Sequence, residues 1–394
     1  MKVKKETKTT FISILLITTI LLQSPLSVRS EPSEKRFTIT SKVTYSNNGA
    51  KNWNLTGEDY AISLFMNNSW QSVSLVGCSL PLNSTRNDTD GNFLGFLNFT
   101  QLEPGYTISY TVKYDVISKP RILPNISEEE SQTLTDINNT LKDIYCKKEG
   151  PWLTDNVYLQ SLAHNLASSE TKVLSIVKNF IRWITDNIDY NSAEVPRYPN
   201  ETYTQRKGDC DDKAILLITL CRIVGIPAYL QVGCIFQFLS FEPQEYWRDS
   251  FGKYHVTSEL RQIAWHGWAI VYIPPWGWLP VDLTYVYGGL GNPLNAIKGA
   301  AVTMQDVIQY MNFTHTDYAG ASRRLRKLLW DNDFYVYMID EMKININFGS
   351  VWELMNLTFK GALIATAVVA VSLAVVFIYK WKRTTKQVSL YDVA

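Results

Sequence analysis

Three side chains of the sequence could together form a nucleophilic site. Cys210 lies directly before an apolar run from Ala214 to Cys221, which predicts a thiol at the start of a buried helix. The free backbone N–H groups and the positive end of the helix dipole at such a position favour the thiolate. His266 and Asp282 follow in the chain, so a base and a carboxylate to orient it are also present.

The acidic residues around this cysteine have a structural explanation. Asp209 is predicted to cap the helix, and Asp212 can return the interaction to the backbone in a variant of the capping box. A calcium loop would need further oxygen ligands and a glycine at a set spacing, which this stretch lacks. Beyond the cap, apolar residues cover almost every side of the helix, so a rigid element would hold the nucleophile.

The histidine and the aspartate are predicted to lie on the two strands of one hairpin. Strand-like residues precede and follow Pro274 and Pro275. If the turn is centred on Pro274, His266 lies directly opposite Asp282. If it is centred on Pro275, the two are diagonal neighbours on one face. Either register brings an imidazole and a carboxylate together.

Three blocks of the sequence resemble the transglutaminase-like superfamily, whose members are thiol enzymes with a papain-like α+β fold. The blocks are Gly208-Asp209-Cys210 with its helix and Gly225-Ile226-Pro227, then His266-Gly267-Trp268-Ala269, then Gly277-Trp278-Leu279-Pro280-Val281-Asp282. The resemblance covers residues 165–290. It implies Cys210 as nucleophile, His266 as base and Asp282 as the residue that orients the imidazole. Two departures are Gly267, where alanine is commoner, and Asp212, where glutamate is frequent.

The resemblance implies an acyl-transfer reaction through a thioester. The thiolate would attack a carboxamide or peptide carbonyl, and water or an amine would release the product. The Cys210 N–H is a natural oxyanion donor, and the second donor is left open among Gln205, Tyr203, Tyr190 and Trp183. Hydrolysis of peptide or amide bonds is the main hypothesis. A cross-linking transglutaminase and a non-catalytic surface binding or scaffold protein are the alternatives.

No cofactor and no metal are predicted. The alternative is a structural zinc site made by Cys210, Cys221, Cys234 and His266. No Cys-X-X-Cys pair exists to support it. Cys78 and Cys146 could form a disulfide, whereas Cys221 and Cys234 are expected to be small core residues or to bridge each other. The odd number of five cysteines leaves at least one thiol free, and Cys210 is the candidate.

Both ends of the chain predict contact with a membrane. Residues 1–30 combine four early lysines with a short apolar stretch, the layout of a signal peptide or signal anchor. Nineteen uncharged residues, 361–379, precede a basic cluster, which predicts a transmembrane helix at 360–380 and a cytoplasmic tail at 381–394. The residues between would form the extracellular ectodomain of a single-pass cell-membrane protein. Its partners would be the membrane and a protein or peptide substrate at the cell surface.

An excess of Asn-X-Ser/Thr triplets favours an exported, glycosylated ectodomain. None of the ten lies between Cys210 and Asp282, as expected of a packed core. The net charge of +1 and the lack of a long basic stretch give little support for a nucleic-acid partner. The triplets begin at Asn54, Asn67, Asn83, Asn87, Asn98, Asn125, Asn138, Asn200, Asn312 and Asn356.

The rest of the chain divides into regions that differ in residue composition and in predicted secondary structure. Residues 31–120 show short strand-like runs between Asn- and Gly-rich turns, which predicts an antiparallel β-sandwich. We expect a helical linker at 121–164, the catalytic core at 165–290 and a C-terminal extension of the ectodomain at 291–359. The predicted fold class is therefore α+β, a papain-like transglutaminase core preceded by a β-sandwich domain, with a C-terminal transmembrane helix.

Several local predictions bear on this division. Apolar residues at helical spacing predict a helix at 170–188. Helices are also expected at 303–313 and 318–330, and the polar stretch 242–258 reads as an exposed excursion. The remaining histidines have no motif around them and are expected on the surface or in loops: His164, His255 and His315.

Overall fold

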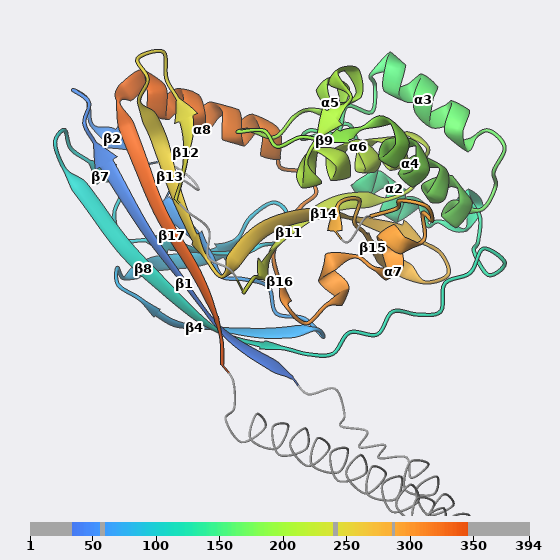
Figure 1. The fold of residues 1–394 in the computed structure, drawn as a ribbon, viewed down its shortest axis with the longest axis horizontal. Coiled ribbons are helices and arrows are strands. Elements are labelled where there is room, and N and C mark those ends of the chain that lie inside the picture. The colour runs from blue at the N-terminus through green and yellow to red at the C-terminus, as the bar shows by residue number, and fades with distance from the viewer. Residues whose placement is uncertain (1–33, 56–59, 239–242, 286–287, 346–394) are drawn as a thin grey trace, which may run out of the picture. The chain divides into compact units, whose positions relative to one another are not determined.

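The computed structural model describes residues 34–55, 60–238, 243–285 and 288–345. From Lys35 onward these residues belong to one compact unit of mixed α/β structure (Figure 1). No helix within these ranges is long and apolar enough to cross a bilayer. The predicted signal segment (1–30), transmembrane helix (360–380) and tail (381–394) lie outside the described residues.

Helix α6 (Cys210–Ile223) is the centre of the helical half of this unit. All of its residues from Asp212 to Arg222 are buried, because three helices contact it and a sheet covers it. The helix predicted at 170–188 is confirmed as α4, which buries seven apolar side chains. Among the described residues, the helices that precede α6 are α2 (Asn139–Tyr145), α3 (Val157–Ala167), α4 (Val173–Asn187) and α5 (Pro199–Gln205), after the short 3-10 turn η2 (Leu134–Asp136).

An antiparallel four-stranded sheet packs against α6. Its strands, in spatial order, are β15 (Gly277–Val281), β14 (Ile263–Ile273), β11 (Ala228–Phe236) and β16 (Val307–Phe313). Apolar side chains from α6 and from this sheet belong to one buried core. The loops carry α7 (Asn295–Lys298), the turn η4 (Ala301–Thr303) and a two-stranded parallel ribbon of β9 (Asp189–Tyr190) and β10 (Lys207–Gly208).

The helix predicted at 303–313 is wrong. Residues 307–313 form strand β16, and the backbone of β16 pairs with β11 from Leu230 to Ile235. Helical spacing of apolar residues is a weak signal in a segment this short, and pairing with a strand distant in the sequence overrides it.

The other half of the unit is a six-stranded sheet. Its order is β12 (Gln244–Arg248), β13 (Tyr254–Arg261), β17 (Phe334–Ile344), β1 (Lys35–Asn47), β8 (Thr107–Ser118) and β4 (Gln71–Cys78). The pair β13–β17 is parallel and the other pairs are antiparallel. Smaller sheets join β3 (Ala61–Ser63), β6 (Phe93–Leu97) and β5 (Leu82–Asn87), and β2 (Trp53–Asn54) with β7 (Gln101–Leu102).

This sheet changes the predicted domain division. Its strands come from the predicted sandwich (31–120), from the predicted core (165–290) and from the predicted extension (291–359). Its central strand β1 pairs with β17 over eleven positions, from Phe37–Ile344 to Asn47–Phe334. The N-terminal strands therefore depend on the end of the ectodomain to complete their sheet. The stretch expected as an exposed excursion supplies β12 and β13 instead.

The two halves share apolar contacts and a helix. One buried cluster joins Phe37 and Val116 of the six-stranded sheet to Cys234 and Ile308 of the four-stranded sheet. Helix α8 (Tyr318–Asn332), close to the predicted 318–330, follows β16 and contacts both β13 and β17 (Figure 1). The halves are therefore packed together rather than connected by a free linker.

Candidate active site

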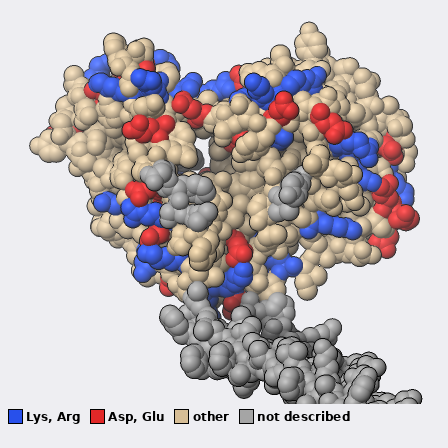
Figure 2. All heavy atoms as spheres, in the orientation of Figure 1, with Lys and Arg blue, Asp and Glu red and all other residues tan. Residues whose placement is uncertain are grey.

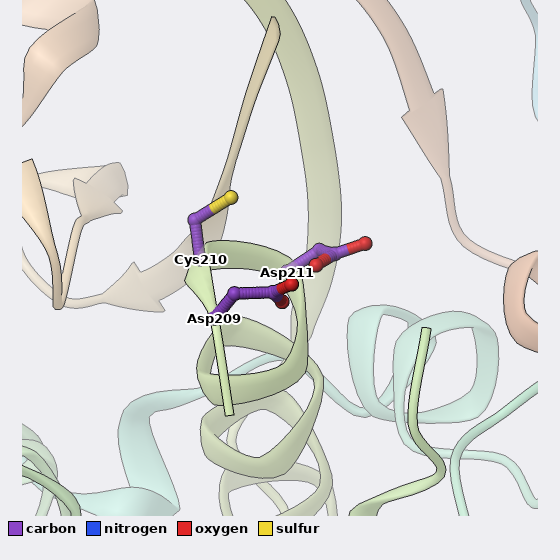
Figure 3. Close-up of side chains that lie close together, drawn as sticks. All are labelled: Asp209, Cys210 and Asp211. Atoms are coloured by element: carbon purple, nitrogen blue, oxygen red, sulfur yellow. The ribbon is translucent and has the colours of Figure 1, made fainter. Parts of the chain in front are cut away.

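The local sequence places Cys210 as the first residue of α6. Asp209 adopts an extended conformation and caps the helix, and its carboxylate accepts from the Asp212 N–H at 3.5 Å. The Asp212 carboxylate accepts in return from the Asp209 N–H at 3.3 Å, so the predicted capping box is confirmed. Cys210 is half-buried. Its side chain extends outward beyond the first turn of α6 (Figure 3).

The hairpin adopts the second of the two predicted registers. Ala269 pairs with Val281 and Tyr272 with Trp278, so the turn is centred on Pro275. His266 and Asp282 are therefore diagonal neighbours just beyond the paired residues. The His266 Nε2 and the Asp282 Oδ2 lie 2.8 Å apart, in hydrogen-bond contact.

The carboxylate of Asp282 is buried and held by backbone donors. Its Oδ1 accepts from the N–H groups of Thr284 and Tyr285, and its Oδ2 accepts from that of Ala301, each at 3.1 Å. Burial alone would raise the pKa of Asp282, but His266 and these N–H groups lower it. The carboxylate is thus fixed in its ionised form beside the imidazole.

The surroundings of His266 favour its protonated form, the imidazolium. Burial alone would lower its pKa, but the Asp282 carboxylate and the side chain of Cys210 raise it to about 10. Because Nε2 is bonded to Asp282, Nδ1 is the ring nitrogen left to face the sulfur. The structure therefore brings all three predicted residues, Cys210, His266 and Asp282, into one contact chain.

Gly267 allows the helix to approach the strand that carries the histidine. A Cβ atom at this position would lie 3.2 Å from the Asp211 Cβ, closer than most side-chain contacts allow. The glycine that departs from the commoner alanine thus has a packing reason. It lets the first turn of α6 reach β14 beside His266.

A pair of carboxyl groups flanks the nucleophile. Side-chain ligand atoms of Asp209, Cys210 and Asp211 all lie within 4.8 Å of one another (Figure 3). Burial, together with hydrogen bonding to Asp209, raises the pKa of Asp211 well above its usual range. A hydrogen bond between two carboxyl groups requires a proton on one of them, and the raised pKa favours the protonated form of Asp211. Tyr318 of α8 also bonds to Asp211, a neighbour that the sequence analysis missed because it lies more than a hundred residues away.

Asp212 anchors the loop that precedes α5. Its carboxylate accepts from the Arg197 N–H at 2.6 Å and from the Arg197 Nη1 at 2.5 Å. Burial and the nearby Asp209 raise the pKa of Asp212 to about 6, although Arg197 opposes this shift. The capping residue therefore also fixes residues 191–198 beside the nucleophile.

The arrangement of the cysteines excludes the zinc alternative. Cys221 lies eleven residues after Cys210 on the same helix, which separates them by about 16 Å along its axis. Both Cys221 and Cys234 are fully buried in apolar clusters. All five cysteines are free thiols in the described structure, so neither disulfide that the sequence allowed is present.

The four candidates for a second oxyanion donor fall into different surroundings. Trp183 and Tyr203 stack on each other with ring centroids 5.8 Å apart, and Arg206 covers both rings. Gln205 is exposed at the end of α5. Tyr190 pairs with Gly208, and burial together with the charge of Cys210 raises its pKa. Of the four, Tyr190 is the residue that interacts electrostatically with the Cys210 side chain.

Residues 160–283 match the family model of the transglutaminase-like superfamily. No curated protein matches the chain. Among solved structures, a proposed cysteine protease from Cytophaga hutchinsonii is 18% identical with a TM-score of 0.46, over 79% of this chain and 90% of that one. The periplasmic domain of TgpA from Pseudomonas aeruginosa is 15% identical with a TM-score of 0.31, over 68% of this chain and 93% of that one.

Red sea bream transglutaminase is 11% identical with a TM-score of 0.28, over 66% of this chain and 49% of that one. At these identities and scores, none of the three structures assigns an activity to the chain. The matched stretch begins in α3 and ends one residue after Asp282, close to the predicted 165–290. Residues 160–283 are therefore a transglutaminase-like core, and this matched stretch contains Cys210, His266 and Asp282.

Proposed function

We propose that the protein is a cysteine-dependent acyl-transfer enzyme of transglutaminase-like type that hydrolyses peptide or amide bonds through a thioester. The observation that carries the proposal is the chain of contacts from Cys210 through His266 to the buried Asp282 carboxylate. An imidazolium stabilised from both sides is the partner that a thiolate requires. A purely structural histidine would have no need of a half-exposed sulfur at its second nitrogen.

The chemistry follows from this geometry in two halves. The Cys210 sulfur attacks the carbonyl carbon, and the C–N bond breaks as His266 gives its proton to the leaving amine. A thioester and a neutral imidazole remain. His266 then takes a proton from water, the hydroxide attacks the thioester, and the acid product leaves as the thiolate and imidazolium are restored.

The negative oxygen that forms during each attack needs donors. The backbone N–H of Cys210 lies in the first turn of α6, where it has no partner within the helix. We assign the second donor to Tyr190, whose backbone pairs with Gly208, two residues before Cys210. Removing one such donor costs about 100-fold or more in rate in thiol and serine hydrolases.

Alkylation of the thiol tests the activated nucleophile. Iodoacetamide at about pH 6 should label Cys210 in the full chain and should fail to label the Cys210→Ala variant. Cys146 is an internal control, because burial raises the pKa of its thiol to about 11. Equal labelling of Cys146 and Cys210 would contradict an activated site.

Amine dependence separates hydrolysis from cross-linking. With a glutamine-containing protein as substrate, a hydrolase should release ammonia at the same rate with or without an added primary amine. Incorporation of the amine at the expense of the acid product would instead establish a transglutaminase. Absence of both reactions in a chain whose Cys210 alkylates would favour the non-catalytic alternative.

The ectodomain is proposed to face the cell exterior on a single C-terminal membrane anchor. Phe37 pairs with Ile344, and the Asn345 N–H donates to the Arg36 carbonyl at 2.7 Å. The start of β1 and the end of β17 therefore lie at the same end of the sheet (Figure 1). Two membrane-directed segments would both suit this end. A full-length protein that carbonate washing removes from membranes would contradict the anchor.

Glycan occupancy gives an independent measure of exposure to a secretory compartment. Asn83 and Asn87 are exposed on β5. Asn312 is half-buried, and its Oδ1 accepts from the Gln231 Nε2 at 2.8 Å. In a glycosylating host we expect glycans at the first two and none at Asn312, as read by mass spectrometry of glycosidase-treated peptides. Unmodified Asn83 and Asn87 in such a host would argue against export.

A further inference from the structure

A cavity of about 990 Å³ lies between the six-stranded sheet and α8. Strands β1, β13 and β17 form one wall, and α8 from Tyr318 to Leu328 forms the other. The surface is hollowed between the two halves of the unit (Figure 2). A volume of this size is in the range that binds drug-sized ligands or short peptides, about 300–1,000 Å³.

The lining of this cavity is aromatic and almost uncharged. Glu194 and Arg324 are the charged side chains among its twenty lining residues, and one is acidic and the other basic. The aromatic residues that line it are Tyr45, Trp53, Tyr110, Tyr246, Trp247, Phe313 and Tyr318. Such a lining favours a neutral ligand with a bulky apolar group.

Trp53 belongs to the apolar lining and is almost fully enclosed. Its ring is 2% exposed and stacks on Phe334 at 4.6 Å, yet its indole N–H has no hydrogen-bond partner among the described residues. An unpaired buried donor is unfavourable unless something supplies an acceptor. The indole nitrogen is itself buried beneath the cavity surface, so a ligand in the cavity would pack against the apolar lining and leave this N–H as it is.

The cavity is connected to the nucleophile through shared residues. Tyr318 lines the cavity and also bonds to Asp211, the neighbour of Cys210. Glu194 lines it as well, and the adjacent Ala193 N–H donates to the Asp209 carboxylate at 3.2 Å. One layer of side chains therefore separates the cavity from the residues that flank the sulfur.

We propose that this cavity binds a bulky apolar side chain of the polypeptide substrate, so that substrate choice depends on the six-stranded sheet and α8. This inference rests on the proposed function, because its substrate is the one that Cys210 attacks. A polypeptide can place a large apolar side chain in the cavity while its backbone extends to the sulfur, because only one layer of side chains separates the two. A free fatty acid would bring a carboxylate into a lining with a single cation.

Matched active-site probes test the proposal on the full chain. Tripeptidyl vinyl sulfones that alkylate Cys210 would carry phenylalanine or glycine at one position in turn, with the rest unchanged. We expect phenylalanine to raise the labelling rate constant about 10-fold or more at one position. In Leu325→Glu, which places a charge in the cavity wall, this preference should fall below about 3-fold.

Leu290→Glu is the control, since Leu290 is 60% exposed and does not line the cavity. It should keep the preference of the natural chain. Ala321→Trp, which fills the cavity from α8, should lose the preference as Leu325→Glu does. An equal rate with both probes at every position, or a preference that Leu325→Glu leaves intact, would overturn the proposal.

Iodoacetamide distinguishes this outcome from failure of the proposed function. The reagent is too small to need the cavity, so Leu325→Glu should label at the unchanged rate. If the natural chain does not label, the enzymatic function fails, and the cavity is tested by titrating Cys210→Ala with an acetyl tripeptide amide that contains phenylalanine. Quenching of tryptophan fluorescence that Leu325→Glu weakens would then support the cavity, and quenching that it leaves unchanged would overturn it.

Discussion

Each half of the molecule contains a histidine–aspartate pair whose imidazole is enclosed. In β14, the His266 Nε2 lies 2.8 Å from the Asp282 carboxylate. In β13, the His255 Nε2 lies 3.0 Å from the Asp249 carboxylate. Both carboxylates also accept backbone N–H groups from residues that follow them closely in the chain. By composition and first contacts the two pairs are nearly the same.

They differ in what the second ring nitrogen meets. The His255 Nδ1 lies 2.8 Å from the Phe334 carbonyl, and the ring stacks on Tyr335 at 4.7 Å. Both of its nitrogens therefore have structural partners, Nδ1 at the start of β17 and Nε2 in the turn that precedes β13. The second nitrogen of His266 faces the Cys210 sulfur instead. An imidazole–carboxylate pair can take part in a reaction only where the second ring nitrogen of the histidine contacts a group that can react.

Replacing the histidine of each pair by alanine should show the largest difference between the two pairs. In His266→Ala, the rate of Cys210 alkylation at about pH 6 should fall about 100-fold or more, because no cation remains to hold the thiolate. In His255→Ala, the rate should stay within about 2-fold while the free energy of unfolding falls by roughly 2–4 kcal/mol. Labelling kinetics and urea unfolding measure the two effects.

The opposite pattern would contradict the assignment. A His266→Ala chain that labels normally would make His266 structural. A folded His255→Ala chain that no longer labels would mean that the fastening of β13 to β17 reaches the active site. Circular dichroism of both variants establishes that the chains compared are folded.

Replacing the aspartate of each pair by asparagine should give a smaller difference between the two pairs. Asp282→Asn keeps the size of the side chain but replaces the negative charge, so the imidazolium loses its partner. We expect a fall of roughly 100-fold in the rate of peptide probe labelling. Asp249→Asn should leave this rate unchanged and lower only the melting temperature. Equal effects of the two substitutions on labelling would remove the distinction between the pairs.

The stability of the site should depend on pH in a defined window. The pKa of His266 is raised from its ordinary 6.5 to about 10 in the folded protein. Its contribution to stability is therefore full below about pH 6.5 and is lost as the pH rises through about 10. We expect His266→Gln to destabilise the protein by roughly 2–4 kcal/mol at about pH 6 and by much less at about pH 10.

Urea unfolding at both pH values measures this difference. In a Cys210→Ala background the window should move to lower pH, because one of the groups that raise the pKa of His266 is gone. A cost of His266→Gln that is the same at both pH values would show that the imidazole carries no charge in the folded state.

The same contrast explains which parts of the molecule the sequence reveals. Cys210, its cap Asp209 and the hairpin that carries His266 are local patterns, in which each residue lies near the residues that define its role. His255 has no such pattern, because its fixed partners include Phe334 from a strand 79 residues away. It was expected on the surface and is instead 1% exposed.

Pairing of distant strands also accounts for the domain division that the structure changed. The sequence of β1 predicts a strand but does not specify its partner in the sheet. That partner, β17, lies almost 300 residues later in the chain. Strand register depends on which apolar faces meet, and many partners are compatible with one alternating pattern. Likewise, Tyr318 could be placed in a helix by its sequence, but its contact with Asp211 depends on how α8 crosses between the halves.

A smaller effect is expected from the raised pKa of Asp211, which lies in the half that contains Cys210. The half that contains His255 has Asp249 instead, whose pKa is lowered. Burial and Asp209 raise the pKa of Asp211, whereas hydrogen bonding to His255 lowers that of Asp249. An acid with a raised pKa opposes folding as the pH rises from its unfolded value through its folded one. Asp211→Asn should therefore stabilise the protein by about 1 kcal/mol near neutral pH and have little effect below about pH 4. Urea unfolding at the two pH values checks the sign, and a loss of stability at neutral pH would mean that Asp211 is ionised in the folded protein.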